Sequence, residues 1–166
     1  MAVWANFYIL TGTAAATLVG LMFIAVTFGS KLVITPETQG QARTFFSPII
    51  YHFAHAFVVA CIAVVPAAGS MLLGVIAIGT SLFRIYMLPG LIKTLRHHHS
   101  NEVQISDWIQ GLILPLALYG LLIASGVAMC IEGPSWAQYG VAFSVLGLVL
   151  LGIVYAWDML VWMASK

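Results

Sequence analysis

Charged side chains are what this sequence has least of. Asp, Glu, Lys and Arg together make up only 7% of its 166 residues, whereas soluble domains carry about 25%. Hydrophobic residues make up 62% of the chain, and its mean hydropathy is +1.05. A chain with so little polar surface cannot cover a water-facing globule, so the composition excludes an ordinary soluble domain and predicts an all-α integral membrane protein.

Motifs of catalysis and of nucleic-acid binding are also missing. Cys61 and Cys130 lie in different apolar segments, without the paired spacing of a zinc site or a disulfide framework, and are expected to be two buried thiols. The sequence has no nucleophile–base motif, nucleotide-binding glycine loop, HExxH zinc signature or basic run. An enzyme is therefore less expected than a non-catalytic protein, and nucleic acid is not an expected partner.

What the sequence does have is a series of long apolar segments. A transmembrane helix needs about 20 such residues, and five segments come close to this length or exceed it. Residues 1–4 lack the basic region of a cleavable signal peptide, so the first segment is expected to remain in the mature protein. We predict one domain over residues 1–166, a bundle of five transmembrane helices. The predicted spans are 4–30, 47–65, 70–92, 107–131 and 135–162.

Prolines mark three places in these segments. Ser47 followed by Pro48 predicts the start of the second helix, with Ser47 as its N-cap. Pro115 predicts a kink in the fourth helix that frees a backbone carbonyl near Gly111. Pro89 leaves the end of the third helix open, because the helix can stop before it or continue with a kink.

The few charges indicate an orientation. With five spans, the loops after the first and third spans share one side with the C-terminus, so the positive-inside rule predicts an outer N-terminus and a cytoplasmic C-terminus. Residues 97–99, three histidines, lie in the longest of these loops and are expected to be solvated. Residues 14–26 are similar to the opening helix of uncharacterised bacterial inner-membrane proteins, which implies the bacterial inner membrane. The basic residues on the predicted inner side are Lys31, Arg43, Lys93, Arg96 and Lys166.

Small residues recur at every fourth position in the first and fourth spans. This spacing lets two helices approach closely in lipid. A single bundle of this size also has little room for a wide pathway, so we expect the protein to pack through these stripes as a homo-oligomer. The predicted helix-packing residues are Gly12, Ala16 and Gly20, and Gly120, Ala124 and Ala128.

Polar side chains interrupt the apolar segments at similar depths. Ionisable groups inside a bilayer are costly, so they are expected to face the protein interior. Four spans place a polar or ionisable group in the predicted cytoplasmic half of the membrane. We therefore expect these side chains to converge on one polar site. The candidates are His52, His55, Arg84, Asp158, Gln110, Tyr51 and Tyr155.

Arg84 determines the expected chemistry of this site. A guanidinium does not lose its proton, so it needs a counter-ion, and Asp158 at matching depth is the natural candidate. Such a pair could be purely structural, or both side chains could reach out to the headgroups. In a functional site, Arg84 with the two neighbouring imidazoles favours an anion over a metal ion.

Three classes of function fit these features. The preferred one is an oligomeric ion channel or passive transporter for small ions, with the polar site at its cytoplasmic end. The second is a non-catalytic subunit that anchors or regulates a larger membrane complex. The third is a haem- or metal-binding redox protein, for which His52 and His55 are weak ligand candidates, because neighbouring histidines on one helix rarely supply both axial ligands of a haem. The first two classes require no cofactor.

Overall fold

The computed structural model describes residues 2–33, 39–65, 69–98, 109–131 and 136–164. All regular structure in these ranges is helical, which confirms the all-α prediction. A 3-10 turn, η1 (Ala2–Trp4), precedes the first helix, and a π-helical turn, η2 (Ile109–Ile113), precedes the fourth. The five α-helices are α1 (Ala5–Val33), α2 (Gln39–Val64), α3 (Ser70–His98), α5 (Leu114–Cys130) and α6 (Trp136–Ala164).

The helices have the length and the surface of membrane spans. Four of the five α-helices described contain a stretch that is long and apolar enough to cross a membrane. The fifth, α2, has a shorter apolar stretch, Pro48–Val64, at the lower limit of about 17 residues for a span. Large apolar side chains point outward, among them Phe28 at 72% exposure, as expected of a surface that contacts lipid. The chain is thus a helical membrane protein. The four stretches that are long and apolar enough to cross a membrane are Ala5–Phe28, Ser70–Met87, Gly111–Cys130 and Trp136–Val161.

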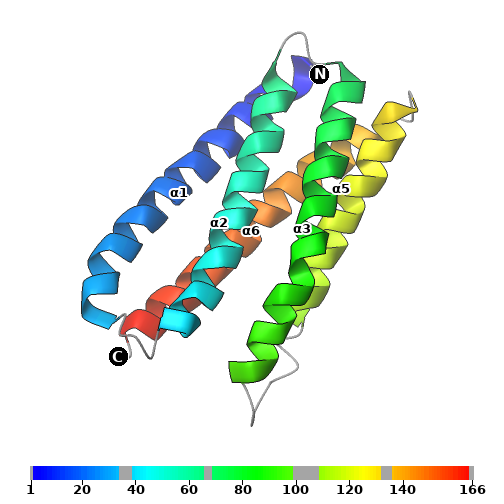
Figure 1. The fold of residues 1–166 in the computed structure, drawn as a ribbon. Helices are drawn as coiled ribbons and strands as arrows, with labels where there is room; N and C mark the ends of the chain where they lie inside the picture. The colour runs from blue at the N-terminus through cyan, green and yellow to red at the C-terminus, as the bar shows by residue number, and fades with distance from the viewer. Residues whose placement is uncertain (1, 34–38, 66–68, 99–108, 132–135, 165–166) are drawn as a thin grey trace.

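The helices α2 and α6 form the middle of the bundle (Figure 1). α2 packs against α1 and α6, and α5 packs against α6 and α3. α3 contacts α5 far more extensively than it contacts α2, although it follows α2 directly in the chain. α1 begins at the end of the bundle opposite to the end where α6 finishes, as an odd number of spans requires.

The start of α2 differs from the prediction. The helix begins at Gln39, so Ser47 is not its N-cap, and Pro48 lies inside it. Pro48 removes the helical hydrogen bond to the carbonyl of Thr44. The turns before Pro48 lie outside the apolar stretch of α2, at a level where water and headgroups can satisfy that carbonyl. The helix therefore tolerates the proline.

Two other prolines are accommodated in different ways. α3 continues through Pro89 to His98, so residues 93–98 are helical rather than part of a loop. Lys and Arg in this extension suit the negative end of a helix. The predicted disturbance at Pro115 takes the form of the turn η2, which ends two residues before the proline. A wider π turn is one way for a helix to adjust to a missing N–H.

Two glycines bring the backbones of α3 and α5 together. A Cβ added to Gly74 of α3 would lie 2.6 Å from the carbonyl oxygen of Gly126 on α5, and a Cβ added to Gly126 would lie 2.8 Å from the carbonyl oxygen of Gly74. The two backbones are in direct contact here, and neither position has room for a side chain. Neither glycine belongs to the predicted stripes.

Only two of the six predicted helix-packing residues pack against another helix of the same chain. Gly12 of α1 packs on α2, since an added Cβ would lie 3.1 Å from the Cβ of Ala60, and Ala128 of α5 is buried. The other four members face outward, and an added Cβ would meet nothing within 4 Å at the two glycines among them. These four are Ala16, Gly20, Gly120 and Ala124.

The two cysteines follow the prediction in one respect only. Both are free, and the Cys130 thiol donates a weak hydrogen bond to the Met71 carbonyl oxygen at 3.8 Å. Neither is buried as predicted, since Cys130 is only partly buried and Cys61 is exposed. Cys61 shares a face of α2 with the exposed Phe57 and Val58, where a thiol is apolar enough to contact acyl chains.

Candidate functional site

Buried polar side chains gather between α2, α3, α5 and α6. His52 of α2 is only 1% exposed, and its Nδ1 lies 2.9 Å from the hydroxyl of Tyr119. Tyr119 comes from α5 and is fully buried. The ring of Tyr155, from α6, lies 5.5 Å from the His52 ring, centroid to centroid. Three helices therefore hold this imidazole in place.

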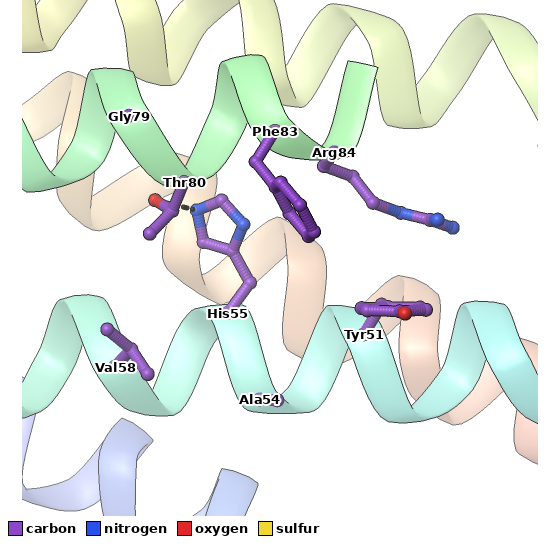
Figure 2. Close-up of a pocket in the computed structure, with 8 residues that line it drawn as sticks. All are labelled: Tyr51, Ala54, His55, Val58, Gly79, Thr80, Phe83 and Arg84. Carbon is purple, nitrogen blue, oxygen red and sulfur yellow. Dashed lines mark hydrogen bonds between the residues drawn. The ribbon is translucent and has the colours of Figure 1, made fainter. Parts of the chain in front are cut away.

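His55, about one turn further along α2, faces α3. Its Nε2 lies 3.1 Å from the hydroxyl oxygen of Thr80, and that hydroxyl donates to the carbonyl oxygen of Ile76 at 2.7 Å. The Thr80 hydroxyl thus joins the imidazole of His55 to the backbone of α3. Figure 2 shows this bond crossing from α2 to α3.

Arg84 of α3 is the cationic group of the site. It is 6% exposed, and its guanidinium carbon lies 4.8 Å from the centroid of the Tyr51 ring, a cation–π distance. The guanidinium also lies close enough to Tyr119 to act on it electrostatically, and Tyr119 in turn bonds to His52. Among the described residues, the buried Nε of Arg84 has no hydrogen-bond partner. One N–H of a permanent cation is therefore left unused.

The expected counter-ion is not part of this cluster. Asp158 is exposed on α6, and within the described ranges no ion pair joins it to Arg84. Tyr155, on the same helix, turns its ring toward His52, so the two residues point in different directions despite similar depth. The side chain of Gln110 lies outside the described residues. The candidates that the structure brings together are Tyr51, His52, His55, Arg84 and Tyr155.

A crevice of about 270 Å³ lies beside the cluster, between α2 and α3. In Figure 2, Arg84 and Tyr51 are at one end of it, and Val58 and Gly79 are at the other. The ring of Phe83 projects from α3 between the two ends. The crevice thus has a cationic end and an apolar end.

The donor set of the cluster does not suit a metal ion. Among the residues that the structure describes, no group of three His, Cys, Asp or Glu side chains could hold one. His52 and His55 direct ring nitrogens to Tyr119 and Thr80. The charge of Arg84 would also repel a cation. The arrangement is suited instead to an anion.

These features define the chain as a helical membrane protein with a buried cationic site. No protein-family model matches the sequence, and no curated protein or solved structure matches it. The geometry of the site is therefore the basis for a function.

Sequence reasoning missed two residues of the cluster, Tyr119 and Thr80. Both are hydroxyl residues within apolar runs, where hydropathy gives them little weight. Thr80 precedes Arg84 by one helical turn, so the two share a face of α3. Tyr119 follows Pro115 at the same spacing on α5. A search for hydroxyl residues four positions before or after Arg84 and Pro115 would have found both.

Removing the Tyr119 hydroxyl tests the cluster. Tyr119→Phe leaves Nδ1 of His52 without its partner in buried surroundings. Leaving buried polar groups unpaired costs about 1–3 kcal/mol, so thermal unfolding in detergent should shift to lower temperature. Tyr86→Phe, at a position that is 77% exposed on α3, is the control. Equal stability of the two variants would contradict the hydrogen-bonded cluster.

Proposed function

We propose that this protein is a passive transporter or channel for anions, with Arg84 as the residue that binds the anion. The observation that supports this most is the burial of Arg84, at 6% exposure, without an ion pair to any carboxylate of the described residues. A cation held in surroundings of low dielectric attracts an anion strongly. Tyr51 and Tyr119 position the guanidinium but do not neutralise it.

The location of Arg84 along α3 supports a role at the mouth of a pathway. Arg84 lies three residues before Met87, where the apolar stretch of α3 ends, a distance of about 4.5 Å along the helix. Tyr51 lies equally close to Pro48, where the apolar stretch of α2 starts. An anion at Arg84 would thus be near the membrane surface that the charges predict to be cytoplasmic.

A pathway through the whole membrane is proposed to need more than one copy of the chain. The bundle is tightly packed where α3 crosses α5 at Gly74 and Gly126. The outward faces of α1 and α5 around Gly20 and Gly120 are open to another subunit, and small residues favour such contacts in lipid. We therefore propose a homo-oligomer as the functional form.

Ion flux into liposomes tests the proposed function. Purified protein, reconstituted alone into phosphatidylcholine vesicles, is expected to carry chloride, nitrate or acetate and to exclude potassium and sodium. Each ion is measured separately with an ion-sensitive dye, over a range of pH, against vesicles without protein. Selective cation flux would contradict Arg84 as the binding group.

Absence of flux for every ion would argue against transport. In that case the second class of function, a non-catalytic subunit of a larger complex, makes a different prediction. Other chains should then copurify with the protein in mild detergent. A transporter should instead run alone as an oligomer of defined size.

A further inference from the structure

We propose that the crevice between α2 and α3 binds a carboxylate that carries a single acyl chain, a fatty-acid anion, and that this ligand enters from the bilayer. The inference rests on the proposed role of Arg84 in anion binding and adds the chemical class of the ligand. It depends on three features of the crevice: the side to which it opens, the distribution of polar and apolar residues along its walls, and the direction in which it runs.

The mouth of the crevice faces the hydrocarbon of the membrane. Tyr51, Val58 and Phe83 line the crevice and are 41%, 40% and 55% exposed. They belong to the apolar stretches Pro48–Val64 and Ser70–Met87, so the surface around them lies at the level of the acyl chains. An inorganic anion would have to lose its hydrating water to reach this mouth through the hydrocarbon, which is strongly unfavourable. An acyl chain is already dissolved there.

The walls of the crevice match a ligand with one charged end. At one end, Arg84 lines the crevice with its guanidinium carbon 4.8 Å from the centroid of the Tyr51 ring. His55 and Thr80, in the middle, are hydrogen-bonded to each other. A carboxylate would therefore bind at the end that Arg84 lines. Beyond this hydrogen-bonded pair the lining is small or apolar, as at Val58 and Gly79 (Figure 2). A carboxylate at Arg84 would therefore have its chain along apolar wall.

The direction of the crevice matches that of a lipid in the adjacent leaflet. Its charged end, at Arg84, lies near the end of the apolar stretch of α3 at Met87, close to the headgroup level. From Tyr51 to Val58 the crevice runs two turns toward the other side of the membrane, about 10 Å. A fatty acid in that leaflet has the same orientation, with its carboxylate at the surface and its chain directed inward.

The size of the crevice favours one chain over two. Its volume of about 270 Å³ lies just below the range of about 300–1,000 Å³ for pockets that enclose drug-sized molecules. It holds a carboxylate and part of one chain, with the remainder of the chain in lipid. A phospholipid with two chains and a bulky headgroup would not fit within it.

Photo-crosslinking tests this proposal. The full-length protein in phosphatidylcholine nanodiscs is irradiated with palmitate that carries a diazirine in its chain, and the modified peptides are identified by mass spectrometry. Crosslinks are expected on residues 54–58 and 79–83. Unlabelled palmitate should compete, hexadecanol, which lacks the charge, should not, and acetate, which lacks the chain, should compete only at far higher concentration than palmitate. Arg84→Gln should lower crosslinking about tenfold, because it removes a charge-assisted hydrogen bond.

A second variant blocks the crevice and keeps the charge. A Cβ added to Gly79 meets nothing within 4 Å, so Gly79→Leu should fold and place its side chain in the crevice that Gly79 lines. Gly20→Leu, at an equally open position of α1, is the matched control. We expect crosslinking to be lost in Gly79→Leu and retained in Gly20→Leu.

Three outcomes would overturn the proposal. The first is crosslinking that survives both Arg84→Gln and Gly79→Leu, and the second is competition by phosphatidylglycerol but not by palmitate, which would identify a phospholipid as the occupant. The third is selective chloride flux without palmitate crosslinking, which would leave the proposed function intact. Crosslinking at the crevice without flux of any anion would support the binding site and overturn transport.

Discussion

Replacing Arg84 by methionine is expected to lower anion flux about tenfold or more without destabilising the bundle. A hydrogen bond to a charged group contributes about 1.5–3 kcal/mol, and each 1.4 kcal/mol corresponds to about a factor of ten. Arg84→Met removes the only cation of the described cluster. If the anion binds there, the loss of flux should reach at least this size in the liposome assay.

The unchanged or increased stability is the more diagnostic half of this prediction. Burial of a guanidinium with an unpartnered Nε is unfavourable. Within the described part of the chain no ion pair is lost, because Asp158 is exposed on α6. Apolar replacements of buried ionic groups have stabilised other proteins by about 1–4 kcal/mol. For Arg84→Met we expect the free energy of unfolding to rise by only about 1–2 kcal/mol, because the lost contacts with Tyr51 and Tyr119 offset part of the gain.

Two further substitutions serve as controls for the Arg84 prediction. Arg84→Lys keeps the charge but lacks the planar fork and the Nε donor, so it should retain part of the flux. Leu82→Met introduces the same side chain at a position of α3 that is 53% exposed, and it should change neither flux nor unfolding temperature. A marked drop in thermal stability of Arg84→Met would show that Arg84 has a structural role instead.

The number and the positions of the helices follow from the sequence because of the solvent. In a bilayer, a long apolar run satisfies its backbone groups only as a helix. Helix ends are different, since α2 starts at Gln39 and α3 continues to His98, both beyond the apolar runs. Beyond the apolar run, the last turns of a helix and the loop that follows are both polar, so hydropathy does not show where the helix ends.

The candidate site could be predicted in depth but not in direction. Depth depends on the position of a residue along its helix, which the sequence provides, and His52 and Arg84 were expected at similar levels. Direction depends on how each helix is rotated against its neighbours. Tyr155 points to His52 whereas Asp158, three residues later, is exposed. That rotation is set by packing along the whole length of α6, including the contact of Gly152 with the Phe53 ring.

The same limit applies to the small-residue stripes. Their spacing predicts close packing but does not indicate which glycine meets which helix. Within α5, Gly120 belongs to a stripe and faces outward, whereas Gly126 does not belong to it and forms the tightest contact with α3. Spacing identifies helices that can approach closely, and only the arrangement of the bundle decides where they do so.

This difference within α5 leads to a matched pair of substitutions. Gly126→Leu is expected to destabilise the bundle by about 3 kcal/mol, at the upper end of the cost of overpacking. A Cβ there would lie 2.8 Å from the Gly74 carbonyl oxygen and 2.9 Å from Cγ1 of Ile78, so α3 and α5 would have to separate. At Gly120, on the same helix, an added Cβ meets no atom of the described residues within 4 Å, so Gly120→Leu should leave the unfolding temperature unchanged.

Thermal unfolding and size measurement in detergent together check this pair. Equal unfolding temperatures for the two variants would contradict the backbone contact between Gly74 and Gly126. Gly120→Leu also tests the proposed homo-oligomer, because leucine on an intersubunit face would prevent close approach of two helices. A smaller oligomer with an unchanged unfolding temperature would assign the subunit contact to this face of α5. An unchanged oligomer would exclude that face and leave the outward stripe of α1, at Ala16 and Gly20, as the next surface to test.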